Sequence, residues 1–358
     1  MSKYKLLIDG NLLDASQYDP VINPATEEII AYAARASLSQ VDQAVEAAHH
    51  AFPKWAENET LRKETLLKAA SALKARAQEV ANLITQEQGR PLHFALGEVA
   101  GTIATFEHYA NFDLPQPEPL RDDPERFVSI ERRPLGVVAA ITPWNVPLIL
   151  LVLKLAPALR AGNTVVAKPS EYTPLSTLLL GDILKDIFPH GVLNIIAGPG
   201  EVGERLSLHP LVRKVTFTGS VATGKRLFAG AATDLKRLTL ELGGNDAAIV
   251  LDDADPEAIA EKIFWGAFWN SGQICFAIKR LYVHEKVFAP LLAALIARAE
   301  RTKVGNGLEE GIELGPLTNL QQYVRVKELV ADAKNNGAQI HTGGEEIKGP
   351  GYFYPPTL

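Results

Sequence analysis

The chain contains a single cysteine, Cys275, in the segment Asn270-Ser271-Gly272-Gln273-Ile274-Cys275. A cysteine thiolate can attack a carbonyl carbon and form a covalent intermediate. Most free cysteines are inert core residues, so a buried structural role is the more common interpretation of Cys275 taken alone, and a catalytic role is the less common one. One cysteine cannot form an intramolecular disulfide, which suits a reducing compartment.

Glu241 is a second candidate for chemistry, because it stands between a mostly apolar run, Leu238 to Leu240, and the flexible pair Gly243-Gly244. Burial at this position would give the carboxylate the basicity that a general base needs. The simpler interpretation of Glu241 is a salt-bridge partner.

Two other polar segments follow apolar runs. Asn145, in Thr142-Pro143-Trp144-Asn145, could donate its side-chain amide to an oxyanion, although asparagine is equally common in turns. Lys168 and Glu171, in Lys168-Pro169-Ser170-Glu171, could hold sugar hydroxyls or form a solvated surface turn.

Glycines mark two possible phosphate-binding turns. Ser220 follows Thr218-Gly219, where its hydroxyl could assist pyrophosphate binding at a helix N-terminus or simply cap that helix. Gly198, Gly200 and Gly203 spell G-x-G-x-x-G, but this weak match favours a plain strand-to-helix turn.

Short β-branched runs that alternate with helical patterns must position these residues. The strand candidates are Val137 to Ile141, Thr164 to Ala167, Val192 to Ile196, Val215 to Thr218 and Leu238 to Leu240. Helical patterns occur between them at Pro147 to Arg160, Pro174 to Ile187, Val202 to Leu208 and Gly224 to Ala231. This alternation predicts an α/β fold with a parallel sheet covered on both faces, and such sheets bind ligands at the carboxyl ends of their strands.

The flanking regions predict other structure. Ser39 to Phe112 shows helical spacing, Leu114 to Glu125 is proline-rich and irregular, and Phe127 to Arg133 alternates like an edge strand. After Gly244 the pattern indicates a helix from Pro256 to Trp269, a strand from Arg280 to His284, and helices at Phe288 to Thr302 and Leu320 to Ala333. A length of 358 residues predicts two domains, the second beginning near Leu242.

The composition argues against several classes of partner. A net charge of -6 gives no general attraction to nucleic acid or to anionic lipid. The most apolar run, Val146 to Leu153, is far shorter than the ~20 residues that span a bilayer. The N-terminal segment carries Asp9 and Asp14, which a secretory signal would exclude, so a cytoplasmic protein is expected.

Five motifs together resemble the aldehyde dehydrogenase superfamily in identity, order and spacing. They are T-P-W-N-x-P at Thr142 to Pro147, K-P-S-E at Lys168 to Glu171, F-T-G-S at Phe217 to Ser220, E-L-G-G at Glu241 to Gly244 and G-Q-x-C at Gly272 to Cys275. The resemblance runs from Ile22-Asn23-Pro24-Ala25-Thr26 to Gly351-Tyr352-Phe353.

The resemblance implies NAD-dependent oxidation of an aldehyde to a carboxylic acid through a thiohemiacetal and a thioester, without a metal. Cys275 would be the nucleophile, Asn145 and the Cys275 backbone N–H would hold the oxyanion, and Glu241 would activate water. Lys154 matches a lysine that the family uses in proton relay. The implied cofactor-binding residues are Ile141, Thr142, Trp144, Lys168, Glu171, Gly200, Thr218, Gly219, Ser220 and Leu242. Because Glu171 would disfavour a 2′-phosphate, NAD is expected rather than NADP.

The resemblance also implies a domain arrangement and partners. Residues 1–120 and 134–241 would form a doubly wound NAD-binding domain with a helical layer, 121–133 a small oligomerisation arm, and 242–358 an α/β catalytic domain. Family members continue further, through an E-x-F-G-P motif that Glu345 to Pro350 only mimics, so the catalytic domain is expected to be C-terminally incomplete. The expected partners are a small aldehyde and, in the complete protein, further copies of the chain as a dimer or tetramer.

Two alternatives remain open from the sequence. One is a CoA-acylating relative, against which the presence of Glu241 argues. The other is a truncated NAD-binding or assembly module without turnover.

Overall fold

A seven-stranded sheet organises the protein, whose computed structural model describes residues 1–358. The strand order is β12-β11-β8-β9-β10-β2-β3. The five predicted strands are all present and all parallel: β8 (Val137–Ile141), β9 (Thr164–Lys168), β10 (Leu193–Ile195), β11 (Val212–Thr218) and β12 (Arg237–Glu241). Two N-terminal strands, β2 (Leu6–Ile8) and β3 (Asn11–Leu13), extend this sheet in antiparallel fashion.

The chain order reverses between β8 and β11. From β8 the chain proceeds outward to β9 and β10, and it then returns to the other side of β8 to form β11 and β12. Ligands of doubly wound sheets bind outside the carboxyl ends of the strands at such a reversal. The reversal therefore marks the edge at which a site is expected.

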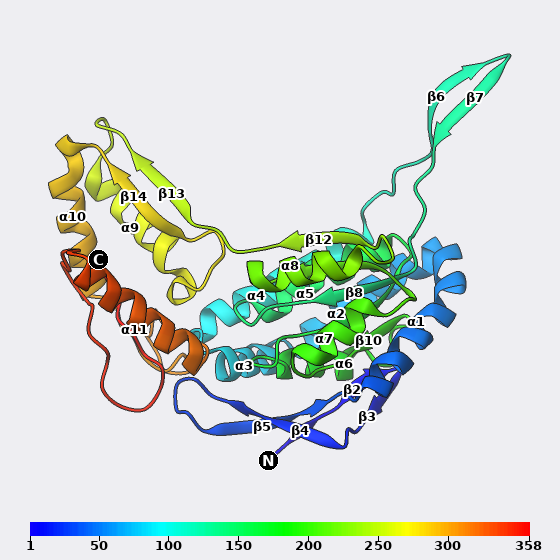
Figure 1. Ribbon diagram of the computed structural model, residues 1–358, viewed down its shortest axis with the longest axis horizontal. Helices are drawn as coiled ribbons and strands as arrows, with labels where there is room; N and C mark the ends of the chain where they lie inside the picture. Colours follow the sequence, from blue (N-terminus) through cyan, green and yellow to red (C-terminus); the bar gives the residue numbers. More distant parts are fainter.

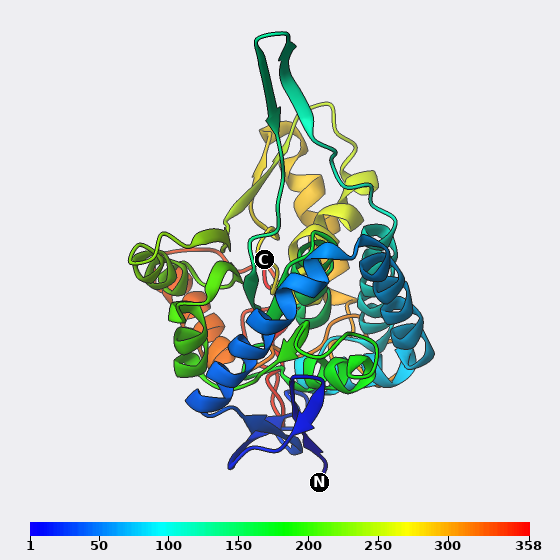
Figure 2. The ribbon, with the colours of Figure 1, turned by 90° about the vertical axis from the view of Figure 1, so that its right-hand side faces the viewer.

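Helices cover both faces of the sheet (Figures 1 and 2). The helices α5 (Pro147–Arg160) and α6 (Leu175–Leu184) pack on one face, beneath the predicted helical layer. This layer consists of α2 (Glu59–Ala75), α3 (Ala77–Gln88) and α4 (Leu92–Ala110). The other face carries α1 (Leu38–Glu57), α7 (Gly200–Leu208) and α8 (Val221–Ala231).

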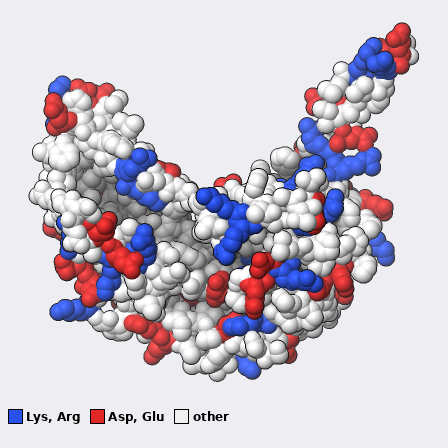
Figure 3. Space-filling model, viewed as in Figure 1, with Lys and Arg blue, Asp and Glu red and all other residues white.

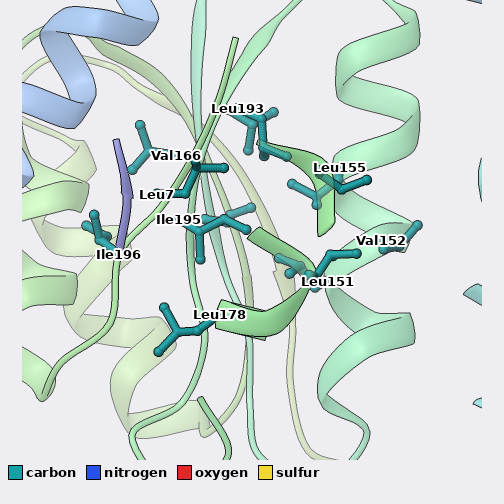
Figure 4. Packing of buried hydrophobic residues seen from close by; sticks show 14 of the residues in the cluster. Leu7, Leu151, Val152, Leu155, Val166, Leu178, Leu193, Ile195 and Ile196 are labelled. Carbon is teal, nitrogen blue, oxygen red and sulfur yellow. The ribbon is translucent and has the colours of Figure 1, made fainter. Parts of the chain in front are cut away.

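The main core lies between the sheet and these helices and contains 55 buried apolar residues. Figure 4 shows Leu151 and Leu155 of α5, and Leu178 of α6, packed beside Val166 of β9 and Ile195 of β10. Every residue of β8 and β9 is buried, as expected for strands covered on both faces. This packing fixes the strand ends that carry the candidate site.

Two small sheets stand outside the main one. The strands β1 (Lys3–Tyr4), β5 (Ile29–Arg35) and β4 (Gln17–Ile22) form the first. The second is a hairpin of β6 (Glu118–Asp123) and β7 (Arg126–Ile130), which projects far from the body of the protein (Figure 1). The hairpin carries exposed apolar side chains at Leu120, Phe127, Val128 and Ile130.

A second lobe follows β12 and has its own apolar cluster, centred on Phe264, Leu291 and Leu295. Its elements are the parallel pair β13 (Asp246–Val250) and β14 (Ile278–Val283), with α9 (Pro256–Phe268), α10 (Glu285–Glu300) and α11 (Leu320–Asn335). Figure 3 shows the surface hollowed between this lobe and the main body. None of the helices is both long and apolar enough to cross a membrane.

The observed elements confirm the α/β fold and correct some local expectations. The segment Leu114 to Glu125 is not wholly irregular, because β6 forms within it and pairs with β7. The edge strand expected at Phe127 to Arg133 ends at Ile130. The N-terminal strands and β13 were not expected from the sequence.

Candidate active site

The carboxyl ends of the central strands are joined by backbone hydrogen bonds that bring the sequence motifs together. The Thr142 amide donates to the Lys168 carbonyl at 3.1 Å, which connects the ends of β8 and β9. The Gly219 amide donates to the Glu241 carbonyl at 3.0 Å, which connects the ends of β11 and β12. Four of the five motifs therefore lie along one edge of the sheet.

Cys275 lies on an irregular loop of the second lobe, and its side chain is exposed. The loop follows a single 3-10 turn, Trp269–Gly272, in which Asn270 and Ser271 adopt left-handed backbone angles, with φ of 54° and 56°. Such conformations are unfavourable for residues other than glycine and often occur at functional sites. The loop therefore holds the thiol on the surface rather than in a core.

A lysine fixes the loop just after the cysteine. The Lys279 ammonium donates to three backbone carbonyls, those of Ile274 and Cys275 at 3.1 Å and that of Ala277 at 3.2 Å. Ile274 itself is buried in a small apolar cluster, whereas Phe276 is exposed. Of the two apolar neighbours of the cysteine, only Phe276 faces solvent.

The Cys275 loop contacts two motifs of the main body. Asn145 donates its side-chain amide to the carbonyl of Gln273 at 2.7 Å. A Cβ atom added to Gly244 would lie only 2.9 Å from the Cys275 carbonyl oxygen, so this turn after Glu241 packs directly on the cysteine backbone. Residues separated by more than a hundred positions thus meet at one place.

Two charged residues of the proposed chemistry lie on neighbouring elements, with Glu241 at the end of β12 and Lys154 on α5. Glu241 is exposed. Lys154 is buried, and its ammonium donates to the Thr218 hydroxyl at 2.6 Å. Burial lowers the pKa of Lys154 to about 8, and the Glu241 carboxylate partly opposes this shift. Lys154 can therefore exchange a proton near neutral pH.

Lys168 is a buried cation at the carboxyl end of β9. Its ammonium donates to a single acceptor, the Pro169 carbonyl at 3.0 Å, so it retains capacity to bind an external oxygen atom. Burial lowers the pKa of Lys168, and the nearby carboxylate of Glu171 opposes that shift. A Cβ on Gly203 would lie 3.3 Å from Lys168 Cδ, so this glycine leaves room for the lysine stem.

The remaining predicted cofactor residues surround the same edge. Ser220 caps α8 by accepting from the Thr223 amide at 3.2 Å, and Leu242 packs on Gly224 in the first turn of that helix. Ile141, Thr142 and Thr218 are buried, Trp144 is half-buried, and Gly200 borders open space at the start of α7. This edge thus combines a helix N-terminus and an ammonium, which donate hydrogen bonds, with the carboxylate of Glu171, which accepts them.

Sequence reasoning did not identify one set of buried polar residues that contacts the loops of the site. It comprises Gln88, Arg90, Glu98, Asn270 and Thr318. The only signal in the sequence is a charged Gln88-Gly89-Arg90 junction between two helical patterns.

Comparison with known proteins connects this geometry to a family. The sequence model of the "Aldehyde dehydrogenase family" matches residues 13–358. The chain belongs to this family. The expected resemblance and fold are thereby confirmed.

Among aldehyde dehydrogenases, one described as "Probable aldehyde dehydrogenase" from Pseudomonas sp is 40% identical over 361 residues, covering 100% of this chain and 73% of that protein. The crystal structure of a putative aldehyde dehydrogenase from Burkholderia cenocepacia matches with a TM-score of 0.96 at 39% identity, covering 100% of this chain and 75% of that one. The NAD+ complex of the enzyme from Bacillus cereus matches with a TM-score of 0.96 at 34% identity, over 99% of this chain and 74% of that one. The protein is an oxidoreductase of the aldehyde dehydrogenase type.

Proposed function

We propose that the protein oxidises an aldehyde to a carboxylic acid with NAD, using Cys275 as nucleophile and Glu241 as the base that activates water. The observation that carries this proposal is the convergence of the Cys275 loop, the Asn145 amide and the turn after Glu241 at the reversal point of the sheet. No metal is required, because polar side chains and backbone amides can stabilise every charge that develops.

The first half of the reaction needs a thiolate and two hydrogen-bond donors. The Cys275 sulfur forms a bond to the aldehyde carbon, and the carbonyl π electrons move to oxygen, giving the thiohemiacetal oxyanion. The Asn145 amide has a second hydrogen beyond the one donated to Gln273, and this hydrogen and the Cys275 backbone N–H stabilise the oxyanion. NAD, when bound, supplies the acceptor for the hydride that leaves this carbon.

The second half of the reaction needs a base. Glu241 takes a proton from water as the water oxygen bonds to the thioester carbon, and the Cys275 thiolate then leaves. The exposure of Glu241 gives it direct access to solvent water. Lys154, whose pKa burial lowers to about 8, accepts this proton in its neutral amine form, and the resulting ammonium is held by donating to the Thr218 hydroxyl at 2.6 Å.

The cofactor proposal rests on the residues around Lys168, at the carboxyl end of β9. Lys168 and Glu171 hold the adenosine ribose, while the N-terminus of α8 with Ser220 faces the pyrophosphate. A carboxylate beside the 2′-hydroxyl repels a 2′-phosphate, which favours NAD over NADP. The relative from Bacillus cereus was solved as an NAD+ complex and 3,6-anhydro-L-galactose dehydrogenase was solved with NAP, so these relatives support a nicotinamide cofactor, and the preference for NAD rests on Glu171.

We further propose that the β6–β7 hairpin joins copies of the chain into a homo-oligomer. Its exposed apolar side chains, including Phe127 and Val128, lie on strands that pair only with each other. An unpaired strand edge of this kind is suited to pairing with another chain.

Two substitutions separate the steps of the proposed reaction. Cys275→Ala should abolish NADH formation with almost no change in NAD affinity, because the thiol acts in chemistry and not in cofactor binding. Glu241→Gln should release about one NADH per site in a burst and then stall, because the thioester forms before the base is needed.

Stopped-flow absorbance of NADH and titration of NAD measure these outcomes. Turnover by the Cys275→Ala variant at the parent rate would disprove the mechanism. Loss of the burst together with the steady state in Glu241→Gln would place this residue before hydride transfer. Acyl-CoA formation on addition of CoA would identify a CoA-acylating enzyme instead.

A further inference from the structure

The junction between α3 and α4 places an ion pair in the interior of the protein. Arg90, whose exposed fraction is only 1%, donates through Nη1 to Glu98 Oε2 at 2.7 Å. The other oxygen of Glu98 accepts from the backbone amides of Leu148 and Ile149, at 2.7 and 3.1 Å. Glu98 thereby binds the N-terminus of α5, directly after the loop that carries Asn145.

Arg90 also holds the Asn145 loop itself. Its Nη2 donates to the backbone carbonyl of Asn145, and the side-chain amide of Asn270 donates to the same oxygen at 3.0 Å. Two donors from different parts of the chain therefore fix the peptide group of the residue that we assign to the oxyanion.

The same junction reaches the cysteine loop through Gln88. The Gln88 side-chain carbonyl accepts from Arg90 Nε at 2.9 Å, and its amide donates to Asn270 Oδ1 at 3.2 Å and to the Thr318 hydroxyl at 3.0 Å. Asn270 has a left-handed backbone, which the surrounding contacts must maintain. The network thus holds both loops of the site from one buried point.

Stability alone is a weak explanation for this arrangement. A buried ion pair commonly gives no more stability than apolar residues of the same volume, because desolvation offsets the attraction between the charges. Besides Glu98, Arg90 contacts the Asn145 carbonyl and, through Gln88, the Asn270 side chain. Both lie on loops that carry reacting groups.

We propose that Arg90, together with Gln88, is a positioning residue for catalysis: it sets the Asn145 amide relative to Cys275. The inference rests on the function proposed above. A displacement of about 1 Å in a reacting geometry can cost roughly a hundredfold in rate. The planar fork of arginine is suited to this task because it reaches Glu98, Gln88 and the Asn145 carbonyl at once, whereas a lysine at this position could not.

A double-mutant cycle tests the inference in the full chain, using single-turnover NADH formation. Arg90→Lys keeps the charge beside Glu98 and should slow NADH formation ten- to a hundredfold, with NAD affinity unchanged. Asn145→Ala should slow it about a hundredfold or more. If Arg90 acts through Asn145, the double variant should be no slower than Asn145→Ala alone.

Arg62→Lys is the matched control. Arg62 is also a buried arginine that donates to backbone carbonyls, those of Trp55, Ala56 and Arg160, but it lies at the opposite end of α5. This variant should lower the midpoint of thermal unfolding and leave the rate of NADH formation at the parent level.

Gln88→Met gives a second route if Arg90→Lys does not fold, because it retains the Arg90–Glu98 ion pair and removes the link to Asn270. The same non-additivity with Asn145→Ala is expected for this variant.

The outcomes separate the two proposals. If the fold-losses of Arg90→Lys and Asn145→Ala multiply in the double variant, the two residues act independently. That result would overturn the positioning role of Arg90, while the proposed function would stand. A parent rate in Asn145→Ala would instead contradict the proposed oxyanion site. A slowed Arg62→Lys enzyme would show that the loss is general to buried arginines, and it would also overturn the inference.

Discussion

Glu171 follows the buried Lys168 in the same loop and is the acid that we assign to the adenosine ribose. Glu171→Ser should raise the ratio of kcat/KM for NADP to that for NAD by about tenfold, or about 1.4 kcal/mol, because it removes the repulsion of a 2′-phosphate. Steady-state kinetics with each cofactor measure this ratio.

Glu107→Ser is the control for the change of net charge. Glu107 is exposed on α4, in the helical layer, so its loss should leave the cofactor ratio unchanged. An equal ratio in the Glu171→Ser variant and the parent protein would exclude Glu171 from the ribose site.

Individual residue types and spacing identified the candidate chemistry, but not the contacts that support it. Cys275 and Asn145 stand in recognisable motifs, and the structure brings both to one place. Gln88 meets Asn270 across 182 positions of sequence, and nothing in the local pattern of either segment indicates that pairing. The exposure of Glu241 could not be predicted either, because it depends on β12 lying at the edge of the sheet.

At the scale of elements, a buried carboxylate caps the N-terminus of α6. Glu87 is fully buried at the end of α3 and accepts from the backbone amides of Leu175 and Ser176, at 2.7 and 2.9 Å. Burial raises the pKa of Glu87 to about 7, against the hydrogen bonds that oppose this shift. The helix that follows the Lys168 turn is therefore held by a group that titrates near neutrality.

This pKa predicts a pH dependence of stability. Between the unfolded value of 4.5 and about 7, the folded state binds the Glu87 proton and the unfolded state does not, so stability falls as pH rises through that window. Glu87→Gln keeps an oxygen acceptor for α6 and removes this loss, which is at most about 3 kcal/mol. Urea unfolding at pH 5 and pH 8 should show that the free energy of unfolding of the variant, relative to that of the parent protein, is higher at pH 8 than at pH 5.

Glu64→Gln, at an exposed position of α2, is the control and should follow the parent protein at both pH values. Parallel pH profiles for Glu87→Gln and the parent would contradict a titration of Glu87 in this window.

Elements with strong periodicity were predictable, and short ones were not. The helix expected at Pro147 to Arg160 is present as α5, because proline at its first turn and apolar residues at helical spacing define it. The strands β2 and β3 have only three residues each, and their place in the sheet depends on pairing with β10 far along the chain. β13 carries exposed residues after a flexible Gly-Gly pair, so it lacks the buried-strand pattern.

On the scale of the whole molecule, the hairpin separates two long stretches of chain that share one core. It carries Arg121 and Arg126 at exposed positions, and the exposed Arg132 and Arg133 follow its second strand. Brief trypsin treatment should cut here first, because exposed loops and tips are preferred sites of proteolysis. Denaturing gels should show two fragments of about one third and two thirds of the chain, as expected for a cut between Arg121 and Arg133.

The cut protein should still migrate as one species in size exclusion, because β2 and β3 of the smaller fragment remain in the main sheet. Slower cleavage at higher protein concentration would support burial of the hairpin between subunits. Early cleavage elsewhere, with the hairpin intact at every concentration, would contradict its exposure.

The pairing of β2 with β10 joins the parts of the chain that precede and follow the hairpin, so the hairpin is a point at which the protein could be divided in two. The N-terminal fragment, with its strands and the four helices up to α4, cannot complete a core without the later strands, and the later strands lack their edge and their helical cover. A gene divided at the hairpin tip would therefore encode two polypeptides that each require the other to fold, and aldehyde oxidation would report on their reunion inside a cell.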